Sequence, residues 1–140
     1  MKKSKKITTL LLCAVLAFGL SACGGEKTPA EPPNLSGEWT QVGKSAADTH
    51  HEAIITEDTI TIYWVSDGGE TKSLYWAGSY TAPTEAGDSY DWTSTNDKEQ
   101  TSKALLASGD DTKDFRFDGK EITYEASAMG TTTTVHLERK

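Results

Sequence analysis

The sequence predicts an all-β domain, a small antiparallel β-barrel or strongly curled sheet of about eight or nine strands, with a β-sandwich as the alternative. Short segments from residue 35 onward alternate apolar and polar side chains, as half-buried strands do. Turn-forming residues recur about every eight to twelve positions, a spacing typical of sandwiches and barrels. No stretch after residue 35 has the apolar repeat of a long helix.

The first strands are indicated by their period of two. Residues 35–42 alternate apolar and polar side chains, and residues 52–56 contain the apolar run Ala53-Ile54-Ile55. Glu57-Asp58 then supplies a two-residue turn. Residues 59–65 form the clearest strand, with one face expected to point into the core. That face consists of Ile60, Ile62 and Trp64.

The middle of the chain continues the pattern. Asp67-Gly68-Gly69 predicts a turn, since glycine adopts positive φ without steric cost. Residues 71–82 are predicted as a strand, residues 83–88 as a loop and residues 89–94 as the next strand. In the first of these strands the shared face consists of Leu74, Trp76, Gly78 and Tyr80, and in the second of Tyr90 and Trp92.

The last third is less regular. Residues 95–108 suit either a helical turn or a strand at 103–106. Residues 113–117 and 121–128 are predicted as strands joined at Asp118-Gly119, a strong hairpin signal. After a turn at Met129-Gly130, residues 131–137 are predicted as the final strand.

Residues 1–22 have the pattern of a secretory signal peptide. Four lysines lie within the first six residues, and an apolar run follows from Ile7 to Leu20. A secretory apolar region needs roughly 7–15 residues, whereas a membrane-spanning helix needs about 20. We therefore expect residues 1–22 to be removed.

The end of this segment, Leu20-Ser21-Ala22-Cys23, resembles the lipobox of bacterial lipoproteins. The resemblance implies cleavage between Ala22 and Cys23 and transfer of a diacylglycerol to the Cys23 thiol. Two acyl chains anchor a protein stably where one is marginal, so the expected location is the extracytoplasmic face of the cell membrane. Cys23-Gly24-Gly25 and the lysine-rich head resemble Gram-positive lipoproteins, as does the general look of residues 35–140.

The predicted mature chain has a tether and a single domain. Residues 23–34 contain three prolines and two glycines but no large apolar side chain, as in a semi-extended linker. Residues 35–140 have the length of one domain. The only cysteine besides Cys23 is Cys13, in the signal peptide, so we expect a domain without disulfides or cysteine–metal sites.

The charge of the chain narrows the range of partners. The net charge is −7 at pH 7 and becomes more negative once the signal-peptide lysines are removed. Nucleic acids and anionic lipid surfaces favour clustered Lys and Arg, so we expect neither as a partner of the domain. Acidity of this kind is typical of soluble, monomeric secreted domains.

No motif points to catalysis, a metal or a cofactor. His50-His51 is expected to be a solvated loop pair and not a metal site. In a strand the two side chains would face opposite sides and could not chelate one metal, and in a loop they have no obvious further ligand. Residues 110–114 are rich in Asp but lack the spacing and the closing Glu of a calcium loop. There is no Gly-x-Ser-x-Gly, phosphate loop or His-Glu-x-x-His. We therefore assign no catalytic residue.

Aromatic side chains are the remaining candidates for a site. Four residues are expected to face the barrel interior, where they fill the core or, alternatively, line a cup for a small apolar or sugar-like ligand. These are Trp64, Trp76, Tyr80 and Trp92. Tyr63 and Tyr75 are expected to face outward and offer a protein-docking patch beside acidic residues.

Gly37 and Trp39 form a Gly-x-Trp on the first predicted strand, which resembles the opening of lipocalin and avidin-like barrels. The resemblance implies that Trp39 packs across the closed end of a barrel. Neither the C-terminal helix of lipocalins nor the biotin-contact pattern of avidin is present in the sequence. Closure of the sheet would also remove edge strands that recruit other chains.

Taken with the anchor, these features predict a lipid-anchored, non-enzymatic binding or interaction module at the cell surface. A small-ligand carrier with an aromatic-lined cavity is the alternative, and an envelope hydrolase is the least favoured one. The sequence identifies neither a protein partner nor a small-molecule ligand.

Overall fold

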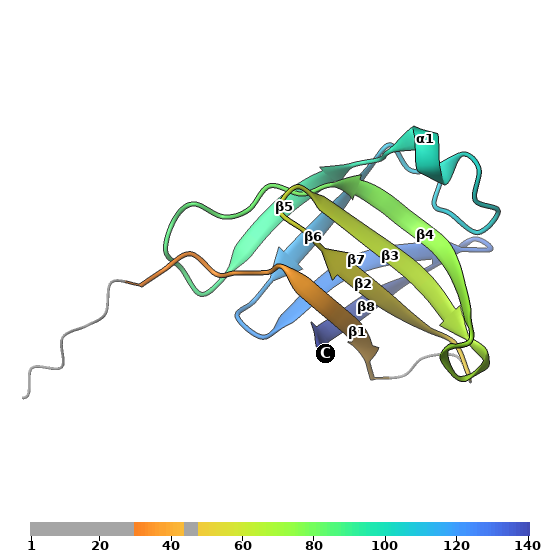
Figure 1. Ribbon diagram of the computed structural model, residues 1–140, viewed down its shortest axis with the longest axis horizontal. Coiled ribbons are helices and arrows are strands. Elements are labelled where there is room, and N and C mark those ends of the chain that lie inside the picture. Colours follow the sequence, from red (N-terminus) through yellow and green to blue (C-terminus); the bar gives the residue numbers. More distant parts are fainter. Residues whose placement is uncertain (1–29, 44–47) are drawn as a thin grey trace, which may run out of the picture.

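The computed structural model describes residues 30–43 and 48–140. Within them the chain forms eight strands, one short 3-10 helix and one single-turn α-helix, so the all-β prediction is confirmed (Figure 1). In chain order these are β1 (Gly37–Val42), β2 (His50–Ile55), β3 (Thr59–Ser66), η1 (Asp67–Gly69), β4 (Thr71–Ser79), β5 (Tyr90–Thr95), α1 (Lys98–Thr101), β6 (Thr112–Phe117), β7 (Glu121–Ala128) and β8 (Thr131–Arg139).

The strands form a single antiparallel sheet in the order β4-β3-β2-β1-β8-β7-β6-β5. Chain neighbours pair with one another except at β4 and β5, and β8 pairs with β1, so the sheet curls into a nearly closed barrel, as predicted. The seam lies between β4 and β5, where Gly78 and Asn96 form an isolated bridge. The amide of Asp97 donates to the carbonyl of Ala77 (2.8 Å), and the amide of Ser108 donates to the carbonyl of Tyr75 (2.8 Å).

Inward-facing side chains from all eight strands make one core. The register places Ala53 opposite Ile62 and Ile55 opposite Ile60, so the predicted apolar faces of the second and third strands meet. Leu35, just before β1, is also buried. The larger members of the core are Leu35, Trp39, Ile55, Ile60, Ile62, Tyr75, Trp76, Tyr80, Trp92, Phe115, Phe117, Ile122, Tyr124 and Leu137.

A β-bulge in β4 corrects the predicted facing of two side chains. The pairing of β3 with β4 shifts between Ile62 and Tyr63, and Tyr75 is the extra residue. Tyr75 and Trp76 are consequently both buried, whereas Leu74, opposite Tyr63, is only half-buried. The extra residue changes the alternation of the strand. The predicted outward position of Tyr75 and inward position of Leu74 are therefore wrong.

The ambiguous segment between β5 and β6 folds as a capped turn. Asp97 caps α1 by accepting a hydrogen bond from the amide of Glu99, so the helical turn lies upstream of the predicted 103–106. Leu105 and Leu106 are exposed. This loop and α1 lie over the β4–β5 seam at one end of the barrel.

The predicted anchor lies outside the described residues, including the cleavage site at Ala22 and the lipidation site at Cys23. Of the predicted tether, residues 30–34 are described, without regular secondary structure. In the described ranges the structure has no helix of the length and apolarity that a membrane crossing requires.

Candidate functional site

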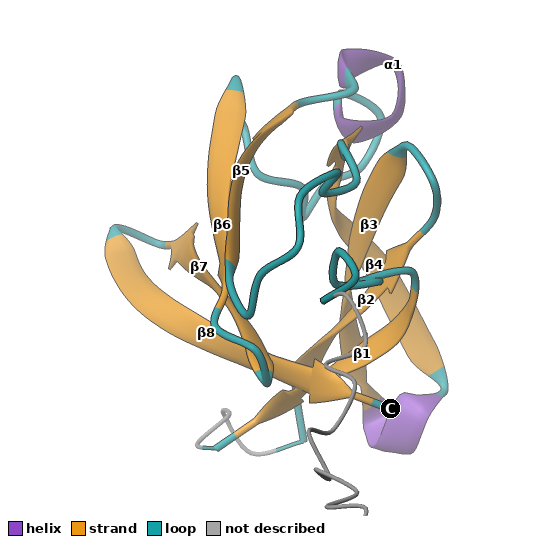
Figure 2. Ribbon diagram, turned by 90° about the vertical axis from the view of Figure 1, so that its left-hand side faces the viewer, coloured by secondary structure: helices purple, strands orange, loops and turns teal. Residues whose placement is uncertain are grey.

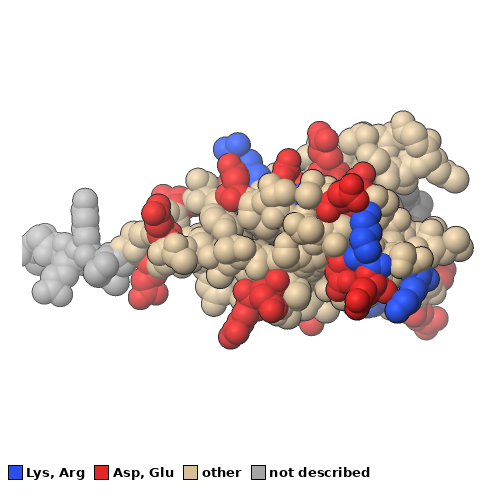
Figure 3. Space-filling model, turned by 90° about the horizontal axis from the view of Figure 1, so that it is seen from above, with Lys and Arg blue, Asp and Glu red and all other residues tan. Residues whose placement is uncertain are grey.

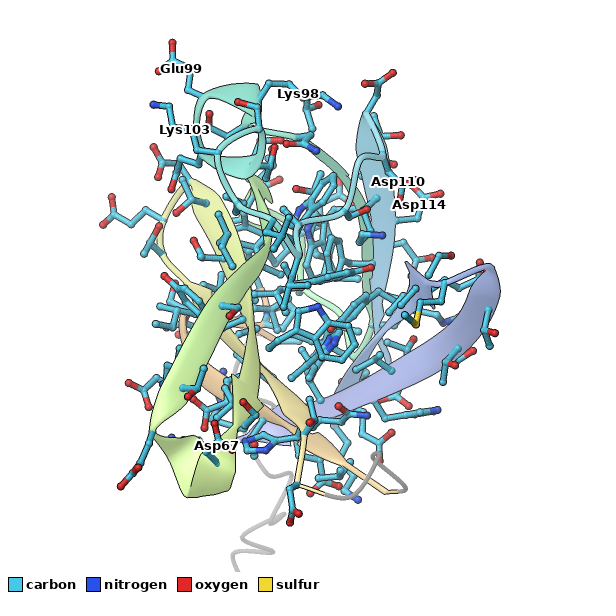
Figure 4. The ribbon with its side chains drawn as sticks, turned by 90° about the vertical axis from the view of Figure 1, so that its right-hand side faces the viewer. Asp67, Lys98, Glu99, Lys103, Asp110 and Asp114 are labelled. Atoms are coloured by element: carbon cyan, nitrogen blue, oxygen red, sulfur yellow. The ribbon has the colours of Figure 1, made fainter. Side chains whose placement is uncertain are left out.

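Strands β6 and β7 diverge at one end of the barrel. They pair only at Phe115–Tyr124, Arg116–Thr123 and Phe117–Ile122. Beyond these pairs, residues 112–114 of β6 remain paired with β5, and residues 125–128 of β7 remain paired with β8. The β7–β8 hairpin bends away from β6 (Figures 2 and 4). We call the opening between residues 112–114 and residues 125–128 the β6–β7 notch.

Backbone groups on both sides of the notch lack a strand partner. The carbonyl of Glu125 accepts a hydrogen bond from Lys113 Nζ (3.1 Å), so it points into the notch. Backbone groups of residues two apart point to the same edge of a strand, which adds Ser127. The carbonyl of Asp111 faces the β5 side, where it accepts from the amide of Asn96 (2.9 Å). Residues of β6 alternate between the β5 edge and the β7 edge of the strand, so Thr112 and Asp114 present their backbone groups to the notch.

Two grooves meet at the notch. One, of about 590 Å³, runs over the outer face of β5 to β8, and the other, of about 430 Å³, lies between the start of β6 and the end of β7. Asp114 and Glu125 line both of them. The charged lining residues are four carboxylates and two bases. They are Asp91, Asp110, Asp114, Glu125, Lys113 and Arg116.

The notch is therefore acidic, like the rest of the domain. Asp110 and Asp114 lie beside β6 near the bent hairpin, whereas Lys98 and Lys103 belong to the α1 end and Asp67 lies at the opposite end of the barrel (Figure 4). On the face shown in Figure 3, carboxylates are spread along the molecule and basic side chains occupy few places.

Lys113 fills the inner side of the notch. Its side chain is 5 % exposed, and Nζ lies 3.0 Å from Asp110 Oδ2. The same nitrogen lies 5.4 Å from the ring centroid of Tyr75 and 5.2 Å from that of Trp76, distances typical of cation–π contacts. Lys113 is not among the residues predicted to form a site. Its signal was the alternation with Phe115 and Phe117, which places it on the inward face.

Behind Lys113 the barrel interior is polar and aromatic. His51 Nδ1 and the hydroxyl of Tyr124 share a hydrogen bond. His51 also contacts Trp64 edge-on at 3.9 Å between centroids and Tyr75 at 4.9 Å. His51 Nε2 and the Tyr75 hydroxyl are buried without a partner in the described part of the chain.

The predicted solvated loop pair at His50-His51 is wrong, because both residues lie in β2 and His51 is fully buried. Only the expectation that adjacent strand residues face opposite sides holds: His50 Nε2 lies 3.5 Å from Glu52 at the surface. Burial, the nearby His50 and then Lys113 lower the pKa of His51 to about 4. Burial raises the pKa of Tyr124 well above its usual value. Both groups are therefore neutral at pH 7.

The four predicted interior aromatics do not form one lining. Trp76 is fully buried and donates from Nε1 to Ser94 Oγ (3.0 Å). Tyr80 packs on Trp92 with centroids 5.3 Å apart, and burial raises the pKa of Tyr80 to about 12. Trp64 is only partly buried and packs beside His51. Trp76, Tyr80 and Trp92 thus belong to the packed core.

Trp39 and Gly37 lie at the beginning of β1. The Trp39 indole donates to the carbonyl of Leu35 (2.9 Å), and Phe117 meets its ring edge-on at 6.0 Å. The guanidinium of Arg139 lies 4.6 Å from the Trp39 centroid. Gly37 has φ of 129°, and a Cβ there would lie 2.9 Å from an Arg139 nitrogen.

Within residues 30–43 and 48–140, no group of three or more His, Cys, Asp or Glu side chains is arranged to hold a metal ion. The aspartates at 110–114 are engaged instead with nearby cations and hydroxyls. Asp110 bonds Lys113, Asp111 lies 2.9 Å from Lys98 Nζ, and Asp114 accepts from Thr93 Oγ1 (2.6 Å).

Comparisons of the chain with protein-family models, with curated proteins and with solved structures gave no significant match. The function proposed below rests on the geometry of this chain.

Proposed function

We propose that the chain is a lipid-anchored, extracytoplasmic binding module that engages a partner at the β6–β7 notch. One observation carries the binding part: β6 and β7, which are neighbours in the sheet, separate after three residue pairs and leave backbone donors and acceptors free beside a groove of about 590 Å³. Unpaired strand edges are sites at which other chains add. Natural sheets usually cover such edges, and here the cover is a single lysine side chain.

The filling of the core favours a partner on the outside of the barrel over a ligand in an aromatic cup. Three of the four candidate aromatics are packed in the core cluster. A site at the notch needs no rearrangement of these side chains. No chemical reaction follows from the geometry, and we propose a non-enzymatic role.

Site-specific photo-cross-linking tests the proposal. A photoreactive phenylalanine derivative in place of Thr112 samples the notch, and the same derivative in place of Glu57 samples the exposed β2–β3 turn as the control. In cells producing the full chain, we expect a discrete adduct from position 112 and none from position 57. No adduct at all, or identical adducts from both positions, would contradict binding at the notch.

The anchor has a separate test. Cys23→Ala removes the only sulfur nucleophile at the lipobox-like sequence. We expect cells fed a labelled fatty acid to label the wild-type chain and leave the variant unlabelled and uncleaved. Labelling that persists in the variant would refute the lipoprotein assignment. It would not bear on binding at the notch, which the cross-linking experiment tests separately.

A second candidate function, a carrier of a small polar molecule, is favoured by two of the three unpartnered buried atoms of the described residues, His51 Nε2 and the Tyr75 hydroxyl, which belong to neighbouring rings. Such groups usually bond water or a ligand. Tryptophan fluorescence titrated with a panel of small sugars tests it, with apolar molecules as the comparison, because the Trp64 ring contacts both His51 and Tyr75. A saturable change would support the carrier, and a flat response across the panel would count against it.

A further inference from the structure

The β6–β7 notch has the features of a site for strand addition. On β7, residues 125–128 continue past the last pair with β6 and present the backbone groups of Glu125 and Ser127 to the opening. Thr112 and Asp114 present theirs from the other side. A segment entering between the two strands therefore meets donors and acceptors on both of its own edges, as a strand inside a sheet does.

The hairpin beyond the barrel also leaves a sheet face without a covering layer. Ala126 points into the core, and its register partner is Thr133. Ala128 lies on the same face two residues later, paired with Thr131, yet is exposed. A strand added along β7 would extend this two-stranded ribbon to three strands, which raises its stability.

Lys113 occupies the place that a bound segment would take. Its ammonium bonds the Glu125 carbonyl, which would otherwise be the first ladder acceptor on β7. An incoming amide can replace this bond. The ammonium then keeps its ion pair with Asp110, whose side chain is half-exposed. The Lys113 side chain therefore caps the free edge of β7 in a way that an incoming strand can replace.

The charge of the two grooves favours one kind of bound segment over another. The two grooves carry four carboxylates and two bases, a net charge of −2. Asp114 and Glu125 have no cation within ion-pair distance among the described residues. Opposite charge raises both the rate and the specificity of association. A second copy of this chain, with a net charge of −7 before any processing, would meet like charge.

Resting on the function proposed above, we infer that the notch binds one extended, Lys- or Arg-bearing segment of a partner protein as an added strand. The segment runs antiparallel to β7, the longer free edge, because antiparallel pairs are the more stable kind. Its alternate side chains lie near Asp114 and Glu125. The partner class is thus a cationic polypeptide with an exposed extended stretch.

The test uses the full chain in detergent and a peptide of about ten residues that alternates Lys and Val. The matched probes are the same peptide with an N-methyl group on every residue, which has no backbone amide left to donate on either edge, and a peptide that alternates Glu and Val. We expect only the first to bind and to slow hydrogen exchange at the amides of Glu125 and Ser127. Equal binding of the methylated peptide, or binding without protection at residues 125–128, would overturn strand addition. Tighter binding of the Glu peptide would overturn the charge argument.

Variants of the chain sharpen the test. Ser127→Pro removes one amide that faces the notch, so the dissociation constant for the Lys-Val peptide should rise about tenfold. Thr132→Ala is the control, since it removes the same Ser127–Thr132 hydroxyl contact (2.8 Å) but no amide. Glu125→Gln with Asp114→Asn keeps the backbone intact and should weaken binding about tenfold as well. Unchanged affinity in both the proline and the double variant would overturn the inference.

Two further results separate this inference from the proposed function. A cross-link from position 112 whose yield is unchanged by Ser127→Pro would support a binding module but overturn strand addition, whereas the absence of any cross-link in the wild-type chain would contradict the binding module itself. A concentration-dependent dimer in sedimentation, lost in Ser127→Pro, would replace the cationic partner with a second copy.

Discussion

His51 and Tyr124 are separated by 73 residues in the chain and share a hydrogen bond inside the barrel. The bond links β2 to β7 across the interior, behind the β6–β7 notch. His51 Nε2 has no partner among the described residues, and Lys113, the residue that fills the notch, lies close enough to disfavour a charge on His51. The polar interior and the open edge are thus neighbouring parts of one region.

Acid should destabilise the fold through His51. Its pKa is about 4 in the folded chain and 6.5 when unperturbed, so the unfolded chain takes up the proton first as the pH falls. Stability should therefore be full above pH 6.5 and decline down to pH 4, by about 3 kcal/mol from this group. Urea unfolding at pH 7 and pH 4 measures the loss.

The control for this prediction is His51→Asn, which retains a polar atom near Nδ1 but does not titrate. Its stability should change less between the same two pH values. Glu52, whose pKa Lys72 and Lys140 lower from 4.5 to about 2 against the desolvating effect of burial, begins to lose its contribution near pH 4.5 and loses the rest towards pH 2, equally in wild type and variant. An equal loss in wild type and His51→Asn would contradict the assignment to His51.

Lys113 should stabilise the barrel more by its hydrocarbon chain than by its charge. Lys113→Ala leaves a void beside Tyr75 and Trp76 and should lower the free energy of unfolding by about 2–3 kcal/mol. Lys113→Met keeps most of the side-chain volume, and water can solvate Asp110 once its partner is gone. The Met substitution should therefore lower the free energy of unfolding by less than about 1 kcal/mol. Urea denaturation of the two variants checks the order; a larger loss for Met than for Ala would refute it.

Gly78 should tolerate no side chain, because it lies where β4 approaches β5 at the seam. A Cβ would lie 2.4 Å from Ser94 Oγ and 2.6 Å from the carbonyl of Thr95. We expect Gly78→Ala to cost about 1–3 kcal/mol by overpacking. Gly109→Ala is the control, because nothing lies within 4 Å of its Cβ position. Thermal unfolding of the pair checks this, and equal melting temperatures would show that the seam can relax.

Arg139 should stabilise the position of residues 34–36, which lead into β1. Its two terminal nitrogens donate to the carbonyls of Ser36 (2.8 Å) and Asn34 (2.6 Å) while the guanidinium covers Trp39. Lysine cannot reproduce this fork, so Arg139→Lys should cost about 1–2 kcal/mol and shift tryptophan emission. Arg116→Lys, at an exposed site, should change stability by less than about 0.5 kcal/mol. Equal effects of the two substitutions would contradict this role.

Much of the strand pattern followed from the sequence because it depends on neighbouring residues only. The alternation at residues 59–65 identified β3 and the inward position of Ile60 and Ile62, although Trp64 is only partly buried, and Asp118-Gly119 marked the β6–β7 hairpin. Turn chemistry and period-two burial act over a few residues, so they can be recognised without a partner strand. The predicted signal peptide and the lipidation at Cys23 stay predictions, since they lie outside the described residues.

The predicted direction of a side chain, into the core or outward, was wrong where pairing with a neighbouring strand determines it. The bulge that turns Tyr75 inward is defined by the register between β3 and β4, and no local signal marks it. His51 became a core residue because β2 begins two residues earlier than predicted, with Trp64 opposite. Propensity alone does not reveal how far a strand extends when its partner continues to offer hydrogen bonds.

The amino-acid sequence by itself determined a disulfide-free, acidic, all-β domain with barrel-like strand spacing, since composition and alternation are properties of single segments. Only the tertiary structure decided that β6 and β7 diverge, that Lys113 caps the freed edge and that His51 meets Tyr124. These features depend on how far each pair of strands stays together, which is a balance between pairing and core packing summed over the whole barrel.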